Sequence, residues 1–228
     1  MPKNKKFSKR DVDKYIRLLE KQIIHLFKNE SGGHDIYHLK RVLGLALILQ
    51  KKEGGDILVI AISAFLHDIH RIISNKNKKY CSPKESLSVI YKILKKVNFP
   101  NEIIPKVLHC IEYHEEYSFT KRGKTVSDIE TLILQDADNL DAIGAMGIGR
   151  VFSYCGAHNI PMWDPHVPLK RDFKEHIHDA PALNHIYAKL LLLKDNMNTR
   201  TAKELAKDRH DYVDNFLKRF LKEWRGVL

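Results

Sequence analysis

Four side chains of the types that bind divalent metals interrupt apolar stretches of this chain. They are a histidine in H-D-I-Y-H-L-K-R-V, an adjacent pair in A-F-L-H-D-I and an aspartate in L-Q-D-A-D-N-L-D-A, namely His38, His67, Asp68 and Asp138. Two imidazoles and two carboxylates suit Mn, Fe, Ni, Co, Zn or Mg rather than a thiolate-bound metal. The set favours the activation of water against a phosphate ester.

The pair His67-Asp68 needs a partner because it interrupts the most apolar run of the chain, A-I-S-A-F-L-H-D-I. A buried, unpaired carboxylate costs several kcal/mol. A shared cation would satisfy the pair, and an ion pair of Asp68 with Arg71 or Lys40 is the alternative. Asp138 stands in a second apolar segment of the same kind, which favours the metal.

Helical periodicity dominates the chain, and few runs alternate as strands do. Periodicity and caps predict helices over residues 12–27, 36–51, 56–69, 82–97, 100–117, 182–196 and 199–224. Ser127 and Glu130 predict a capping box that opens a further helix, the one that carries Asp138. The stretch 156–181 lacks periodicity, which is typical of a lid or binding loop. We therefore predict an all-α, single-domain fold, with a basic tail at residues 1–10 and the helical domain at 11–228.

Charge and composition limit the partners of the protein. The chain has 39 Lys and Arg against 28 Asp and Glu, a net charge of +11, which favours anionic partners such as nucleotides. The aromatic and basic alternation typical of nucleic-acid binding is missing, so that partner ranks low without being excluded. We find no apolar run of about 20 residues and no signal peptide, and therefore expect no membrane partner.

The cysteines indicate a reducing compartment. Cys81, Cys110 and Cys155 are odd in number, widely spaced and without a C-x-x-C pair. This pattern is typical of reduced structural thiols, and it predicts a cytoplasmic protein.

Taken together, these residues resemble a known family. The order H…HD…D is that of the HD-domain metal-dependent phosphohydrolases. The chain is most similar to small bacterial HD proteins that include a nucleoside triphosphate pyrophosphohydrolase. That branch shares H-D-x-x-H-x-x-R-V at residues 34–42, Q-D-A-D-x-L-D-A-I-G-A-x-G-I-x-R at 135–150, and K-L-L-x-L-K-D-x-M-x-T through A-x-x-R-H at 189–210.

The resemblance implies an HD-type helical bundle with one divalent ion held by His38, His67, Asp68 and Asp138. Asp68, His34 and His114 are the expected catalytic residues. The general acid is left unassigned, with His34, Asp35, His70 and His114 as candidates. Phosphate-binding cations are expected within the shared motifs, at Arg41, Arg150, Lys189, Lys194 and Arg209.

Comparison with other HD enzymes at two places in the chain narrows the expected activity and the expected number of metal ions. HD enzymes that hydrolyse guanosine tetraphosphate and HD 5′-deoxynucleotidases carry Glu where this chain has Arg71, which argues against both activities. His109 and His114 occupy the region where two-metal HD phosphodiesterases place extra ligands. They are five residues apart, about 140° around a helix, so a single ion is favoured.

The predicted function is a divalent-metal-dependent phosphohydrolase acting on nucleotides, with pyrophosphate release from nucleoside triphosphates as its specific form. The alternatives are a phosphodiesterase or phosphomonoesterase acting on another small phosphorylated molecule, and a nucleotide sensor without catalysis. The metal, the base, the sugar and the oligomeric state are left open.

Overall fold

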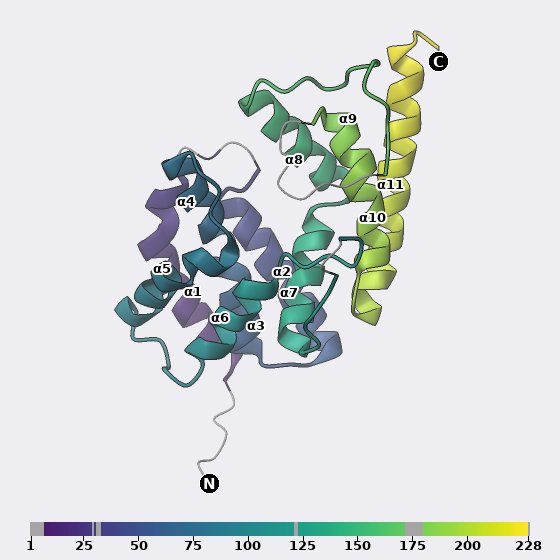
Figure 1. Cartoon of the computed structure of the whole chain (residues 1–228). Helices are drawn as coiled ribbons and strands as arrows, with labels where there is room; N and C mark the ends of the chain where they lie inside the picture. Colours follow the sequence, from purple (N-terminus) through teal and green to yellow (C-terminus); the bar gives the residue numbers. More distant parts are fainter. Residues whose placement is uncertain (1–6, 29, 31–32, 121–122, 172–179, 228) are drawn as a thin grey trace. The chain divides into compact units, whose positions relative to one another are not determined.

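Every regular element in the described part of the chain is helical (Figure 1). The computed structural model describes residues 7–28, 30, 33–120, 123–171 and 180–227. Its internal contacts divide the chain into two compact units, one formed by residues 1–30, 34–115 and 126–137, the other by 31–33, 116–125 and 138–228. The prediction of an all-α fold is confirmed. The boundary between tail and domain stays a prediction, because residues 1–6 lie outside the described part.

The first unit contains the predicted metal ligands His38, His67 and Asp68 and the helices that position them. Its elements are α1 (Lys9–Ile23) with the 3-10 turn η1 (Ile24–Phe27), α2 (Ile36–Glu53), α3 (Ile57–Leu66), α4 (Ile69–Asn77), α5 (Pro83–Lys96), α6 (Ile104–Tyr113) and the larger part of α7 (Ile129–Asp141). Helix α6 is shorter at both ends than the predicted 100–117, because residues 101–103 form a turn before it and residues 114–115 a turn after it.

Helix α3 is the centre of the first unit. It contacts α1, α2 and α6, and every residue from Leu58 to Leu66 is buried. A helix that is apolar on all sides is stable only when it is enclosed in this way. The carboxylate of Asp56 caps it by accepting hydrogen bonds from the backbone N–H groups of Leu58 at 2.9 Å and Val59 at 3.3 Å.

By length and composition alone, the stretch Ile57–Asn77 could cross a membrane, which corrects the expectation that no stretch would pass such a test. Most of this stretch is buried inside the fold. The chain also leaves the helical path within this stretch, at Asp68 between α3 and α4. Burial of this extent is typical of a core helix.

The start of α7 differs from the prediction. Asp128, rather than Ser127, accepts hydrogen bonds from the backbone N–H of Thr131 at 3.0 Å and from its hydroxyl at 2.7 Å. Glu130 accepts a hydrogen bond from the backbone N–H of Asp56 at 2.9 Å, where it links α7 to the start of α3. The predicted capping box of Ser127 and Glu130 is therefore wrong.

The second unit is built around the long C-terminal helix. Its elements are α8 (Gly144–Ala157), α9 (Ala182–His185), the π-helical turn η2 (Ile186–Leu190), α10 (Leu191–Leu193), the 3-10 turn η3 (Lys194–Asn196) and α11 (Arg200–Trp224). The predicted helix 182–196 is thus one helical path in four segments. Residues 172–179 of the predicted lid lie outside the described part, so the lid stays a prediction.

Glycine is required where α7 turns into α8. Gly144 has a φ of +76°, which L side chains rarely adopt. A Cβ atom on Gly147 would lie 2.1 Å from the backbone oxygen of Ala142. The G-A-x-G-I part of the shared motif therefore serves a tight turn between two helices.

Candidate metal centre

The adjacent residues His67 and Asp68 stand at the junction of α3 and α4, and not inside one helix as the apolar run predicted. Asp68 has φ −92° and ψ 11°, in a sparsely populated region of the backbone map where many active-site residues lie. Both side chains are buried, with 0% and 2% of their residues' surface exposed. The junction lets two consecutive side chains face the same space.

His38 reaches these residues from the first turn of α2. The carboxylate of Asp35 caps α2 by accepting a hydrogen bond from the backbone N–H of His38 at 2.7 Å. The Nε2 atom of His38 lies 3.2 Å from Nε2 of His67 and 3.2 Å from Oδ2 of Asp68. The third distance, from His67 Nε2 to Asp68 Oδ1, is 3.6 Å.

The two distances of 3.2 Å fit a common cation. Two ligand atoms that each lie about 2.1 Å from an ion are roughly 3.0–3.4 Å apart when the angle between them is 90–109°. His38 Nε2 therefore stands at such a distance from both His67 Nε2 and Asp68 Oδ2, while His67 Nε2 is slightly farther, at 3.6 Å, from the other oxygen of Asp68. The predicted convergence of these three residues is present in the first unit.

Hydrogen bonds fix which nitrogen of His67 faces the ligand set. Its Nδ1 lies 2.9 Å from the backbone oxygen of Ala64. A carbonyl oxygen only accepts, so Nδ1 carries the proton and Nε2 keeps its lone pair in the neutral ring. Metal-binding histidines are commonly oriented by such a bond to a carbonyl.

Asp68 is the charged centre of the cluster. His34, just before α2, donates from Nδ1 to Oδ2 of Asp68 at 2.7 Å. Burial alone would raise the pKa of Asp68, but the charges of His67 and His34 and the hydrogen bonds from His34 and His38 hold this pKa well below its usual value. The carboxylate is thus ionised, the state in which it binds a metal.

The competing ion pairs do not account for Asp68. Lys40 pairs with Glu20 at 2.6 Å. Arg71 places Nε at 3.8 Å from Asp68 Oδ1, while its NH2 group forms a close ion pair with Glu115. The close partners of Asp68 are therefore histidines, which favours the metal reading of the sequence.

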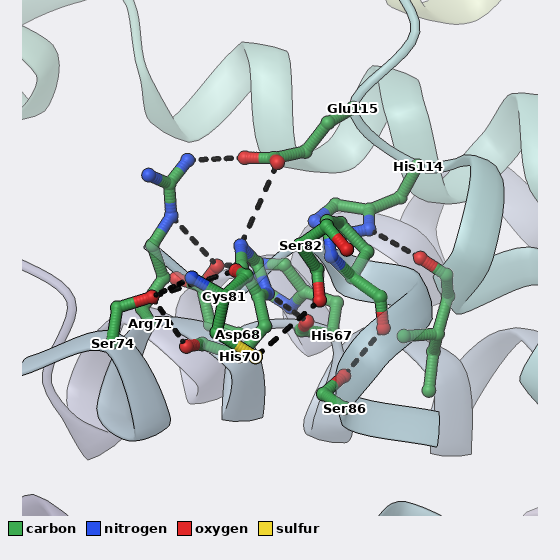
Figure 2. A network of polar contacts seen from close by, with 12 residues as sticks. His67, Asp68, His70, Arg71, Ser74, Cys81, Ser82, Ser86, His114 and Glu115 are labelled. Atoms are coloured by element: carbon green, nitrogen blue, oxygen red, sulfur yellow. Dashed lines mark hydrogen bonds and ion pairs between the residues drawn. The ribbon is translucent and has the colours of Figure 1, made fainter. Parts of the chain in front are cut away.

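A second group of side chains adjoins the first, as Figure 2 shows. His70 points its Nε2 towards Glu115 Oε2 at 3.6 Å, and the His70 and His114 rings have centroids 5.5 Å apart. The His114 ring is also 5.1 Å from that of His67. Burial would raise the pKa of Glu115, but Arg71 and His70 hold it well below its usual value.

Sequence reasoning named His114 and His70 but missed Glu115. Nothing in the local pattern Y-H-E-E-Y distinguishes Glu115 from its neighbour, and its partner Arg71 is 44 residues away. Glu116 has another role: its carboxylate accepts hydrogen bonds from the backbone N–H and hydroxyl of Thr125. The predicted divergence of His109 and His114 agrees with the structure, since His109 is exposed and pairs with Asp128 at 3.0 Å.

Asp138 lies on α7 and is half-buried. It is the first residue of α7 assigned to the second unit, and its role as the fourth ligand stays a prediction. Its neighbour Asp141 is an ion-pair partner of Arg150, at 3.2 Å.

The five predicted phosphate contacts are divided between the units, Arg41 in the first and the other four in the second. Arg150 donates to the backbone oxygen of Gly33 at 2.8 Å, and Arg209 donates to that of Leu140. Lys189 lies on the π-helical turn with its Nζ 4.7 Å from the centre of the Tyr117 ring. Arg150 and Arg209 thus have structural roles, and substrate contact by any of the five stays a prediction.

The all-helical fold and the buried His-His-Asp cluster define the class of the protein. The HD domain family matches residues 35–143, which include His38, His67, Asp68 and Asp138. This chain belongs to that family, and it is a metal-dependent phosphohydrolase of the HD type.

The relatives extend over most of the chain. YpgQ, an uncharacterized protein of Bacillus subtilis strain 168, is 34% identical over 205 residues, which cover 89% of this chain and 90% of YpgQ. An HD-superfamily hydrolase of Bacillus thuringiensis has a similar structure, with 35% identity, a TM-score of 0.66, and 95% and 98% of the two chains covered. The structure of YpgQ in complex with ADP has a TM-score of 0.67 and 31% identity, and covers 89% of this chain and 96% of YpgQ.

Proposed function

We propose that this protein hydrolyses nucleotides and that it releases pyrophosphate from nucleoside triphosphates. The observation that carries the proposal is the spacing of His38, His67 and Asp68, which suits a divalent ion. The nucleotide is supported by the ADP complex of YpgQ and by the net charge of +11, which attracts polyphosphates. The three cysteines are free and buried, in keeping with a proposed cytoplasmic location.

The donor set fits one divalent ion at His38, His67 and Asp68, with Asp138 proposed as the fourth ligand from the sequence pattern. When bound, such an ion supplies water of lowered pKa and polarises a phosphoryl oxygen. His34 holds the Asp68 carboxylate in place through the bond at 2.7 Å. Because His34 is partly exposed, with 27% of its side-chain surface accessible, it is also placed to exchange protons with solvent.

Arg71 places a positive charge beside this centre, with its Nε atom 3.8 Å from Oδ1 of Asp68. Arg71 stands where HD enzymes that hydrolyse guanosine tetraphosphate and HD 5′-deoxynucleotidases carry Glu. We propose Arg41, Arg150, Lys189, Lys194 and Arg209 as phosphate contacts, from their places in the shared motifs. Arg150 and Arg209 also donate to backbone oxygens.

The test is a hydrolysis panel of nucleoside mono-, di- and triphosphates with Mn²⁺, in which the products are separated by ion-exchange chromatography. We expect equal amounts of nucleoside monophosphate and pyrophosphate from triphosphates. Asp68→Asn and Asp138→Ala should each abolish hydrolysis and lower the bound metal, while His109→Gln, outside the centre, keeps both at the wild-type level.

The alternatives give different products. Release of orthophosphate alone would replace the pyrophosphohydrolase by a phosphomonoesterase. Nucleotide binding without turnover of any nucleotide would indicate a sensor and overturn the proposal. Unchanged metal content in Asp138→Ala would remove Asp138 from the ligand set.

A further inference from the structure

Three side chains beyond the H…HD…D pattern form a second set of metal-ligand atoms. One atom each from His70, His114 and Glu115 lies within 4.8 Å of the other two. His70 is fully buried, His114 is 3% exposed, and the Glu115 side chain is 19% exposed. All three belong to the first unit, and the labels of Figure 2 allow them to be followed together.

Backbone bonds fix the same tautomer in both histidines. His70 donates from Nδ1 to the backbone oxygen of His67 at 3.0 Å, and His114 donates from Nδ1 to that of Ile111 at 2.7 Å. The Nε2 atom of each neutral ring therefore carries the lone pair. This is the orientation that carbonyl groups give to histidines that bind metals.

The Nε2 atom of His70 is buried and has no hydrogen-bond partner among the residues that the structure describes. Its nearest acidic group is Oε2 of Glu115 at 3.6 Å, too far for a hydrogen bond. Buried polar atoms are almost always satisfied, so a lone pair in this position calls for a ligand. Glu115 keeps Oε2 for that purpose, because its Oε1 is the atom that Arg71 binds.

We propose that His70, His114 and Glu115 bind a second divalent cation beside the ion at Asp68. Two imidazole nitrogens and one carboxylate oxygen suit Mn, Fe, Co, Ni or Zn. The two sites adjoin, since His67, Asp68 and His114 also offer atoms within 4.8 Å of one another. The protein thus holds a pair of ions, which goes beyond the single ion expected from the sequence.

An ion pair between a protonated His70 and Glu115 is the competing explanation, and metal counting separates the two. The purified full-length protein is stripped with chelator, loaded with Mn²⁺, desalted and measured by inductively coupled plasma mass spectrometry. We expect two equivalents per chain in the wild type. His70→Gln and Glu115→Gln should each retain one, and so should His38→Gln, which removes a ligand of the first ion.

His109→Gln is the matched control, because it removes an exposed histidine of α6 that pairs with Asp128 outside both sets. It should keep two equivalents. Electron paramagnetic resonance gives a second readout: the wild type should show an exchange-coupled Mn²⁺ pair, and the His70→Gln and Glu115→Gln variants an isolated Mn²⁺.

One equivalent in the wild type, without a coupled signal, would overturn the proposal even if no variant folded. Two equivalents retained in both His70→Gln and Glu115→Gln would equally exclude this ligand set. Neither readout depends on turnover, so failure here is distinct from failure of the proposed nucleotide hydrolysis.

Discussion

Loss of the His67 imidazole should remove the thermal stabilisation that the ion at Asp68 provides. His67 Nε2 stands 3.2 Å from His38 Nε2 and 3.6 Å from Asp68 Oδ1, so His67→Gln removes one of three converging ligands. A ligand at 100 times its Kd stabilises the folded state by about 2.7 kcal/mol. For a chain of this length, 1 kcal/mol shifts Tm by about 2–4 °C, so the ion contributes roughly 5–11 °C.

His34→Gln provides a graded comparison, because His34 holds the Asp68 carboxylate rather than facing the other ligands. Loss of such a supporting hydrogen bond weakens metal affinity by about 10–100-fold. At the same Mn²⁺ concentration, about 0.4–1.4 kcal/mol of the stabilisation remains, or roughly 1–6 °C.

Differential scanning fluorimetry measures Tm with and without Mn²⁺ for each variant. Comparing these shifts within a variant cancels any change in the stability of the metal-free protein. The part of the Tm shift that the first ion provides should be lost in His67→Gln, whatever shift a second ion adds. It should be partly kept in His34→Gln and fully kept in His109→Gln. A metal-induced shift in His67→Gln equal to that of the wild type would refute the ligand assignment.

Two further predictions concern the fold. Gly147→Ala should destabilise the protein by about 1–3 kcal/mol in urea denaturation, because the new methyl group would meet the backbone oxygen of Ala142. Gly149→Ala in the same helix has open space and should be neutral or stabilising by about 0.4–1 kcal/mol; similar losses in both would contradict the close approach. Burial would raise the pKa of Asp128, but hydrogen bonds from Thr131 lower it overall. The ionised cap of α7 is therefore fully effective above the unfolded pKa of about 4 and is lost as the pH falls through the lower folded value. Asp128→Ala should accordingly cost about 1 kcal/mol at pH 7 and less at pH 3, and a cost that grows on acidification would show the sign to be wrong.

The sequence predicted the helices well because their periodicity and caps are local. Ser82, at the start of the predicted helix 82–97, caps α5 in a capping box with Glu85, and Thr199, at the start of the predicted helix 199–224, caps α11. The wrong capping box at the start of α7 was predicted because Ser127 and Asp128 are adjacent and either could be the N-cap residue. Serine and aspartate cap helices about equally well, and the choice here depends on Glu130 being taken by the distant backbone of Asp56.

The convergence of His38 with the pair His67-Asp68 was predictable because an apolar run cannot bury a carboxylate without a partner. The break between α3 and α4 could not be predicted, since residues 57–77 are apolar enough for one continuous helix. The role of Glu115 could not be foreseen either. Its ion pair with Arg71 joins residues 44 apart, and such a pairing is visible only once the helices are placed.

One local feature of the metal centre, a hydrogen bond from histidine to the backbone just before it, can nevertheless be recognised in other sequences. His67, His70 and His114 each donate from Nδ1 to the carbonyl three residues earlier. Helix ends leave carbonyl oxygens without a partner in the helix, and a histidine near such an end can satisfy one of them. The same bond leaves the Nε2 lone pair pointing away from the backbone. A histidine that ends a buried apolar helix is therefore prepared, by its own helix, to bind a cation before any other ligand is in place.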